Sequence, residues 1–150
     1  IVVKGIHDLA VRFSRCCNPV PGDEIVGFVT RGRGISIHRT DCINMINLPE
    51  DERSRLIDAE WQKPEMDSGS TTYDTEIKVY ANNRIGLFVD ISKVFTERQI
   101  DIKSMNVRTS KQGMATITMT FETHGVEELN RLTDKIRQID SVLDIERSTG

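Results

Sequence analysis

The chain has 150 residues, of which 37% are hydrophobic and 29% are charged, and its formal net charge is −3. These proportions are typical of a globular protein and exclude a disordered or collagen-like chain. No apolar run approaches the roughly 18–20 residues of a membrane-spanning helix, so we expect no membrane insertion.

The chain begins with Ile1 rather than Met and shows no basic-then-apolar signal segment, so we expect a piece of a longer protein. Its three cysteines, Cys16, Cys17 and Cys42, are an odd number. This count argues against a disulfide framework and favours a reduced, cytoplasmic setting.

The first block of sequence is expected to form a small α+β module. In chain order we expect a strand over residues 1–5, a short helix with Ile6, Leu9, Ala10 and Phe13 on its apolar face, a loop over residues 16–22, strands over residues 25–30 and 35–38, one or two helical turns over residues 41–46, and a closing strand over residues 56–62. The helix follows from its apolar spacing, and the loop follows from its two prolines.

A segment typical of a linker follows this block. From Pro64 to Thr72 the only large apolar residue is Met66, among Gly and a Ser/Thr cluster. We therefore expect a first domain over residues 1–63, a linker over residues 64–73 and a second domain over residues 74–150.

The second block has clearer periodicity. In chain order we expect a strand over residues 75–80, a helix over residues 86–98, a strand over residues 100–109, a turn over residues 110–113, a strand over residues 114–123, a helix over residues 126–139 and a strand over residues 142–146. The strand over residues 114–123 alternates between apolar and Thr side chains, which indicates one buried face. The order β-α-β-β-α-β predicts a ferredoxin-like unit, small enough to favour dimerisation.

No catalytic constellation is evident. Gly32-Arg33-Gly34 begins like a dinucleotide-binding fingerprint, but Ile37 stands where the third glycine belongs, and no Gly-Lys-Ser/Thr motif occurs. We therefore expect that this piece is not an enzyme by itself.

Cys16, Cys17, His38 and Cys42 are the residue types of a structural zinc site. His38 and Cys42 are four residues apart, which suits a strand-to-helix corner. The side chains of the adjacent Cys16 and Cys17, however, diverge on extended backbone. The alternative, which the residues alone favour over zinc, is that the cysteines pack as small hydrophobic residues under the proline-containing loop.

A basic turn in the first block suggests contact with RNA phosphate. Residues 1–42 carry six basic and four acidic side chains, whereas residues 43–72 carry three and seven. The arginines that would face RNA are Arg12, Arg15, Arg31, Arg33 and Arg39. The alternative is an ordinary hairpin with solvated arginines. Only Phe28 is close enough in sequence to offer stacking, so phosphate contact would dominate over base reading.

In the second block, the segment Asn83-Arg84-Ile85-Gly86-Leu87 joins a strand to the start of a helix. The exposed N–H groups of such a helix start suit a carboxylate, and Asp101 at the start of the next strand could meet an ammonium group. The alternative is a plain capped turn.

Two stretches resemble known families. Residues 16–42, from Cys-Cys-Asn-Pro-Val-Pro-Gly to His-Arg-Thr-Asp-Cys, resemble the ribosome-intersubunit domain of the long RelA/SpoT-type stringent-response enzymes, also called the zinc-finger or conserved-cysteine domain. Residues 83–87, followed by Asp90-Ile91, resemble the first loop and helix of an ACT domain. Together they imply the regulatory tail of a bifunctional enzyme that makes and hydrolyses guanosine tetra- and pentaphosphate.

The resemblance implies that a GTP pyrophosphokinase and a (p)ppGpp pyrophosphohydrolase activity lie upstream in the parent chain. It also implies contact with large-subunit ribosomal RNA and A-site tRNA, and it leaves zinc open. For the ACT domain it implies an amino acid bound at a homodimer interface by Asn83, Arg84, Ile85, Gly86, Leu87, Asp101 and Ile102. Because the surroundings are rich in Ile, Leu and Met, we expect a branched-chain amino acid. Three hypotheses follow: a ribosome-binding regulatory tail, an amino-acid sensor, and a ligand-free dimerisation module.

Overall fold

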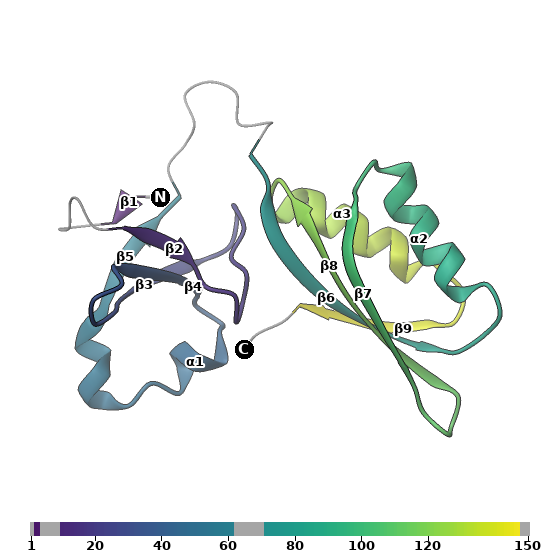
Figure 1. The fold of residues 1–150 in the computed structure, drawn as a ribbon, viewed down its shortest axis with the longest axis horizontal. Coiled ribbons are helices and arrows are strands. Elements are labelled where there is room, and N and C mark those ends of the chain that lie inside the picture. Colours follow the sequence, from purple (N-terminus) through teal and green to yellow (C-terminus); the bar gives the residue numbers. More distant parts are fainter. Residues whose placement is uncertain (1, 4–9, 62–70, 148–150) are drawn as a thin grey trace. The chain divides into compact units, whose positions relative to one another are not determined.

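The computed structural model describes residues 2–3, 10–61 and 71–147 (Figure 1). The chain divides into two compact units, with the boundary between Thr71 and Thr72. Residues 64–70 of the expected linker lie outside the described residues, and Tyr73, the last residue of that linker, already begins a strand. None of the helices in the described part of the chain is long and apolar enough to cross a lipid bilayer.

The first unit is built on a five-stranded sheet with the strand order β1-β5-β3-β4-β2. Its elements are β1 (Val2–Val3), β2 (Val11–Phe13), β3 (Ile25–Val29), β4 (Ile35–Arg39), α1 (Ile43–Ile46), the 3₁₀ helix η1 (Glu50–Arg55) and β5 (Leu56–Glu60). Strand β2 pairs with β4 in parallel, and the other pairings within this sheet are antiparallel. The predicted α+β character and the later strands of this block are confirmed.

The helix predicted to end at Phe13 is wrong over its last residues. Val11–Phe13 instead form β2, in register with Ile35–Ile37. The Phe13 ring stacks on Trp61 at a centroid distance of 5.6 Å, a contact 48 positions away that no local pattern reveals. Pairing with β4 and this ring contact therefore override the helical spacing, whose first positions, Ile6 and Leu9, lie outside the described residues.

Strand β4 is buried along its whole length and divides the first unit into two small cores. Because side chains alternate along a strand, Ile35 and Ile37 point to one face and pack with Ala59. Ser36 and His38 point to the other face. On that side the buried residues are cysteines and one methionine, namely Cys17, Cys42 and Met45.

The second unit has the predicted β-α-β-β-α-β order. Its elements are β6 (Tyr73–Asn82), α2 (Leu87–Glu97), β7 (Ile102–Thr109), β8 (Met114–Thr123), α3 (Val126–Arg137) and β9 (Val142–Arg147). The four strands form an antiparallel sheet in the order β7-β8-β6-β9, and both helices cover the same face of it (Figure 1). The ferredoxin-like arrangement is confirmed.

The core of the second unit lies between the sheet and the two helices. Alternate residues of β6 and β8, such as Ile77 and its cross-strand partner Met119, are fully buried and meet Leu87, Ile91 and Leu132. Thr116, Thr118 and Thr120 of β8 point to the opposite face, whereas Thr123 is buried. Strand β7 is the outermost strand on one side of the sheet.

Candidate metal centre and the arginines around it

The four predicted metal ligands converge at the end of β4. Cys16 and Cys17 lie in the loop after β2, His38 lies in β4, and Cys42 lies at the residue before α1. Their ligating atoms all lie within 4.8 Å of one another. Cys17, His38 and Cys42 are buried, and Cys16 is half-buried.

The spacing of these atoms fits a tetrahedral zinc site. Sγ of Cys16 lies 3.4 Å from Sγ of Cys42, 4.0 Å from Sγ of Cys17 and 3.3 Å from Nδ1 of His38. A tetrahedron with Zn–S bonds of about 2.3 Å has S–S edges of about 3.8 Å. Three sulfurs and one imidazole nitrogen are also a common zinc donor set, so the residues present fit the ion.

The expectation that Cys16 and Cys17 diverge is wrong, because the backbone there is not extended. Residues 15–17 form a turn, closed by a hydrogen bond from the backbone N–H of Asn18 to the carbonyl oxygen of Ser14. Asn18 adopts a positive φ of 47°. The turn directs both neighbouring sulfurs to the same side.

Hydrogen bonds around the cluster orient its members. Oγ of Ser36 lies 3.0 Å from Nε2 of His38, which leaves Nδ1 facing the cysteines. The backbone N–H of Arg39 donates to Sγ of Cys17 at 3.3 Å, and Oγ of Ser14 lies 2.8 Å from Sγ of Cys16. Donors to sulfur stabilise a thiolate, the form that binds metal.

The thiols and the imidazole differ in their titration. Burial raises the pKa of Cys17 and of Cys42. At Cys16, burial acts to raise the pKa, but hydrogen bonds, led by that from Ser14, outweigh it and the pKa is lowered. Burial and then the positive charge of Arg12 lower the pKa of His38, which favours the neutral, ligating imidazole. A bound cation would draw the remaining protons off the buried thiols.

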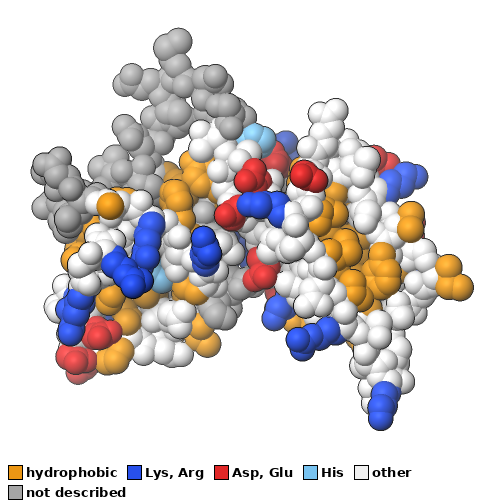
Figure 2. Space-filling view, in the orientation of Figure 1, with side chains coloured by type: hydrophobic (Ala, Val, Ile, Leu, Met, Phe, Trp, Pro, Cys, Tyr) orange, Lys and Arg blue, Asp and Glu red, His pale blue; other side chains and the backbone are white. Residues whose placement is uncertain are grey.

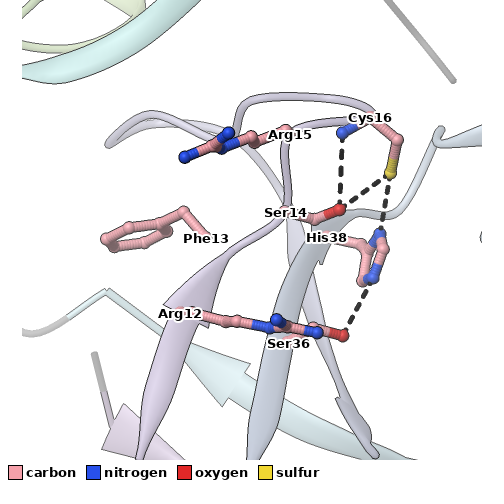
Figure 3. Close-up of a pocket in the computed structure, with 7 residues that line it drawn as sticks. All are labelled: Arg12, Phe13, Ser14, Arg15, Cys16, Ser36 and His38. Carbon is pink, nitrogen blue, oxygen red and sulfur yellow. Dashed lines mark hydrogen bonds between the residues drawn. The ribbon is translucent and has the colours of Figure 1, made fainter. Parts of the chain in front are cut away.

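Two predicted RNA-binding arginines lie beside this cluster. Arg12 in β2 and Arg15 in the following turn are exposed, and both line a pocket of about 630 Å³. Its lining residues are Arg12, Phe13, Ser14, Arg15, Cys16, Ser36 and His38 (Figure 3). We call it the Arg12–Arg15 pocket.

Arg31 and Arg33 lie in the exposed turn between β3 and β4. The turn is held by Thr30, whose Oγ1 donates to the carbonyl oxygen of Gly34 and accepts the backbone N–H of Arg33. Figure 2 shows Lys and Arg side chains gathered over β2 and β4 on the visible face of the first unit. The turn thus adds positive charge near the start of β4.

The prediction that Arg39 contacts RNA is corrected by the structure, because this side chain is buried. Its side chain is only 8% exposed, donates to the carbonyl oxygen of Cys17 and forms a 2.5 Å ion pair with Asp41. A guanidinium held in this way supports the cysteine loop and does not face a phosphate. The sequence spacing, which placed Arg39 next to the basic turn, carried no information about this burial.

The structure also contains an aromatic pair that the sequence did not indicate. Phe13 lines the Arg12–Arg15 pocket and stacks on Trp61, whose Nε1 donates to the carbonyl oxygen of Asp23. The sequence offered only Phe28 for stacking near the basic turn, whereas the structure places Phe13 beside Arg12 and Arg15. Only the parallel pairing of β2 with β4 places Phe13 here, and no local signal predicts that pairing.

The seven predicted amino-acid-binding residues do not come together within one copy of the chain. Asn83–Leu87 follow the end of β6, next to the β7–β8 turn, where the backbone N–H of Asn83 donates to the carbonyl oxygen of Gly113. Asp101 and Ile102 lie at the other end, because Ile102 pairs with Phe121, which pairs with Thr75. At about 3.3 Å per residue, roughly 23 Å of β6 separates the two groups.

Individual residues of these two groups are placed differently. Arg84 forms a 2.8 Å ion pair with Asp90 and donates to the carbonyl oxygen of Asp140, so it braces the loop. Ile85 is fully exposed, and Gly86 has a φ of 83° that favours glycine. Asp101 lines a separate pocket of about 380 Å³ at its own end of the sheet.

Comparisons with known proteins divide the chain at the same region. A family model described as the RelA/SpoT RIS domain matches residues 1–62, and one described as the ACT domain matches residues 69–147. A GTP pyrophosphokinase of Escherichia coli is 39% identical over 151 residues, which cover 100% of this chain and 20% of the relative. A GTP pyrophosphokinase of Streptomyces coelicolor is 38% identical, with 100% of this chain and 17% of the relative covered.

Among solved structures, the ACT domain from the GTP pyrophosphokinase of Chlorobium tepidum matches with a TM-score of 0.46 and 22% identity, over 51% of this chain and 99% of that one. The chain spans about a fifth of the length of the curated relatives that it matches.

Proposed function

The chain belongs to the ACT domain family, with a RelA/SpoT RIS domain ahead of its ACT domain, and we propose that it is the regulatory region of a stringent-response GTP pyrophosphokinase. In this proposal the parent chain makes and hydrolyses (p)ppGpp with domains outside these residues. The region itself is non-catalytic and senses starvation through contact with large-subunit ribosomal RNA and A-site tRNA, in the cytoplasm.

The observation that carries the ribosome contact is the basic edge of the first unit. Arg12, Arg15, Arg31 and Arg33 are exposed along β2 and at the turn that precedes β4. RNA binding depends strongly on such positively charged surfaces, because each phosphate contact releases counterions. Arg39 is not part of this proposed surface.

A zinc ion held by Cys16, Cys17, His38 and Cys42 would give this edge its rigidity. The ion would supply structural cross-linking, since four protein ligands leave no open coordination position for catalysis. The residues of the chain then do the work: Cys16 and Cys17 fix the turn that carries Arg15, and His38 fixes the adjoining strand. Reduced thiols suit a cytoplasmic setting.

Sedimentation with ribosomes tests the proposed function. We expect the chain to pellet with bacterial ribosomes that carry uncharged tRNA in the A site, and to pellet less as salt rises. The same ribosomes with an occupied, aminoacylated A site serve as the comparison. Failure to pellet with either preparation, at low salt and with a folded chain, contradicts the ribosome contact.

A second candidate function is favoured by the position of the ACT residues at opposite ends of the sheet. If two copies pair along β7 in antiparallel fashion about a twofold axis, the start of β7 in one copy approaches the end of β7 in the other. The loop at residues 83–87 and the partner copy's Asp101 would then meet across the interface. We propose that a branched-chain amino acid binds there.

Titration calorimetry combined with analytical ultracentrifugation tests this second function. We expect heat on adding valine, isoleucine or leucine, and a sedimentation coefficient of a dimer. A dimer that gives no heat with any of the three at millimolar concentration supports the alternative, a ligand-free dimerisation module. A monomer that gives no heat contradicts both the amino-acid site and the dimerisation module.

A further inference from the structure

The Arg12–Arg15 pocket lies at the outermost strand of the first sheet and combines cations, hydroxyls and an aromatic ring. Arg12 and Arg15 are its charged members, and the seven described residues that line it include no carboxylate. Within the described part of the chain, neither arginine forms an ion pair. Two exposed guanidinium groups at one pocket, unpaired in this way, attract an anion.

The geometry of the arginines suits a phosphate group. A guanidinium presents paired N–H donors that match the oxygens of a phosphate, and it remains charged at every physiological pH. Oγ of Ser14 and Oγ of Ser36 lie in the same lining. Figure 3 shows Arg15 extending over the side of the strand where Phe13 lies, and Arg12 extending from β2 toward Ser36.

The aromatic ring extends the recognition from a phosphate to a nucleotide. Phe13 is 40% exposed, and its stacking on Trp61 fixes the orientation of the ring. Unpaired RNA bases stack on rings of this kind, whereas bases inside a duplex are not accessible to them. Because Arg12 and Phe13 are successive residues of a strand, they leave β2 on opposite sides, and a ligand that meets both must cross the edge of that strand.

Building on the ribosome contact proposed above, we propose that this pocket binds one unpaired nucleotide of RNA, with its phosphate on Arg12 and Arg15 and its base against Phe13. The turn at Arg31 and Arg33 then contributes long-range attraction rather than the binding site. The pocket and the candidate metal centre share Cys16 and His38, so a metal ion bound by these residues would also hold the pocket in shape.

The test compares two double variants with equal changes of charge. Arg12→Gln with Arg15→Gln removes the pocket cations, and Arg31→Gln with Arg33→Gln removes the turn cations. Binding of a fluorescein-labelled RNA hairpin with an unpaired loop is followed by anisotropy between about 50 and 200 mM salt. We expect the pocket variant to bind at least about tenfold more weakly than the native chain. We also expect the slope of log affinity against log salt concentration, called the salt slope, to become smaller by about one unit. The turn variant should lose less in both quantities.

A third variant, Phe13→Leu, tests the base contact. We expect it to lose about tenfold in affinity with an unchanged salt slope, because stacking involves no counterion release. All variants are checked by circular dichroism, and a fully base-paired RNA duplex serves as the probe without unpaired bases. We expect the native chain to bind this duplex more weakly than the hairpin.

Three outcomes overturn the pocket assignment. Equal affinities of the pocket variant and the native chain for the hairpin would exclude the arginines, and a larger loss in the turn variant would move the site to residues 31–33. Displacement of the hairpin by GMP at micromolar concentration would make the pocket a site for free nucleotides. None of these three outcomes changes the sedimentation of the native chain with ribosomes. If the native chain binds the hairpin but does not sediment with ribosomes, the ribosome contact alone is contradicted.

Discussion

At the scale of single residues, Ser36 determines how His38 faces the cysteines. Oγ of Ser36 lies 3.0 Å from Nε2 of His38, and Ser36 is buried. We expect Ser36→Ala to lower the zinc affinity by about 10–100-fold, because the imidazole loses the partner that fixes its orientation. Competition with a chromophoric chelator measures this. Ser104→Ala, on the second unit, is the matched control, and equal affinities of both variants would contradict the role of Ser36.

We expect the metal content of the protein to depend on the sulfurs and not on the packing around them. We expect about one zinc ion per chain in protein purified without added metal, and a large loss of zinc in Cys42→Ser. Met45→Leu is the control, because Met45 packs in the same buried cluster and the swap conserves its volume. Atomic emission measures the zinc. A folded native chain without zinc would show that the cysteines serve packing alone.

The sequence identified the types of the site residues but not their arrangement. Cys16 and Cys17 were recognisable as candidate ligands, yet their convergence depends on a turn with a positive φ at Asn18, which a periodicity argument does not detect. The same limit applies to Arg39, whose buried guanidinium donates to the carbonyl oxygen of the distant Cys17, and to Phe13, whose partner Trp61 is distant in sequence. The contacts of Arg39 and Phe13 are tertiary, whereas the turn at Asn18 is local but has no periodic pattern.

At the scale of elements, the turn between β3 and β4 is fitted against the start of β2. Gly34 has a φ of 77°, and a Cβ at this position would collide with the backbone oxygen of Ala10. That oxygen accepts the backbone N–H of Ile35 at 2.8 Å, so it cannot move without weakening the junction of β2 with β4. Gly32 has a φ of 90°, but a Cβ added there would meet no other atom within 4 Å.

These two glycines give a matched pair. We expect Gly32→Ala to cost about 1–2 kcal/mol of unfolding free energy, from the left-handed backbone alone. Gly34→Ala should cost a further ~1–3 kcal/mol, because the methyl group displaces packed backbone. Urea unfolding followed by the fluorescence of Trp61, the single tryptophan, measures both. Equal costs would mean that β2 accommodates the methyl group freely.

Elements with strict periodicity were predictable, and those defined by pairing were not. In the second unit, the alternation of Ala115, Ile117 and Met119 with threonines predicted β8 within its observed bounds. In the first unit, the three residues of β2 are too few to show a period. Their strand conformation comes from parallel pairing with β4, which lies more than 20 positions later in the chain.

At the scale of the whole molecule, each unit has its own core, so we expect two separable thermal transitions. A strong zinc chelator should lower the first-unit transition by at least about 10 °C, because metal-binding energy is folding energy in a small domain. Phe121→Leu should lower only the temperature of the second-unit transition, since the ring of Phe121 packs against that of Phe95 at a centroid distance of 5.0 Å. Calorimetry measures both thermal transitions, and the fluorescence of Trp61 identifies which of them belongs to the first unit. A single transition that shifts as a whole would contradict independent units.

The parallel junction of β2 and β4 has a mechanical consequence. Val11–Phe13 and Ile35–Ile37 run side by side in the same direction, and each strand leads into candidate metal ligands. Cys16 follows β2, His38 lies near the end of β4, and Cys42 follows β4. With a metal ion bound, tension applied from the N-terminal side would load the backbone hydrogen bonds of β2 in shear before reaching the metal–sulfur bonds. The bound ion would thus cross-link the ends of β2 and β4. Such a cross-link would limit how much of the sheet an external force can unfold.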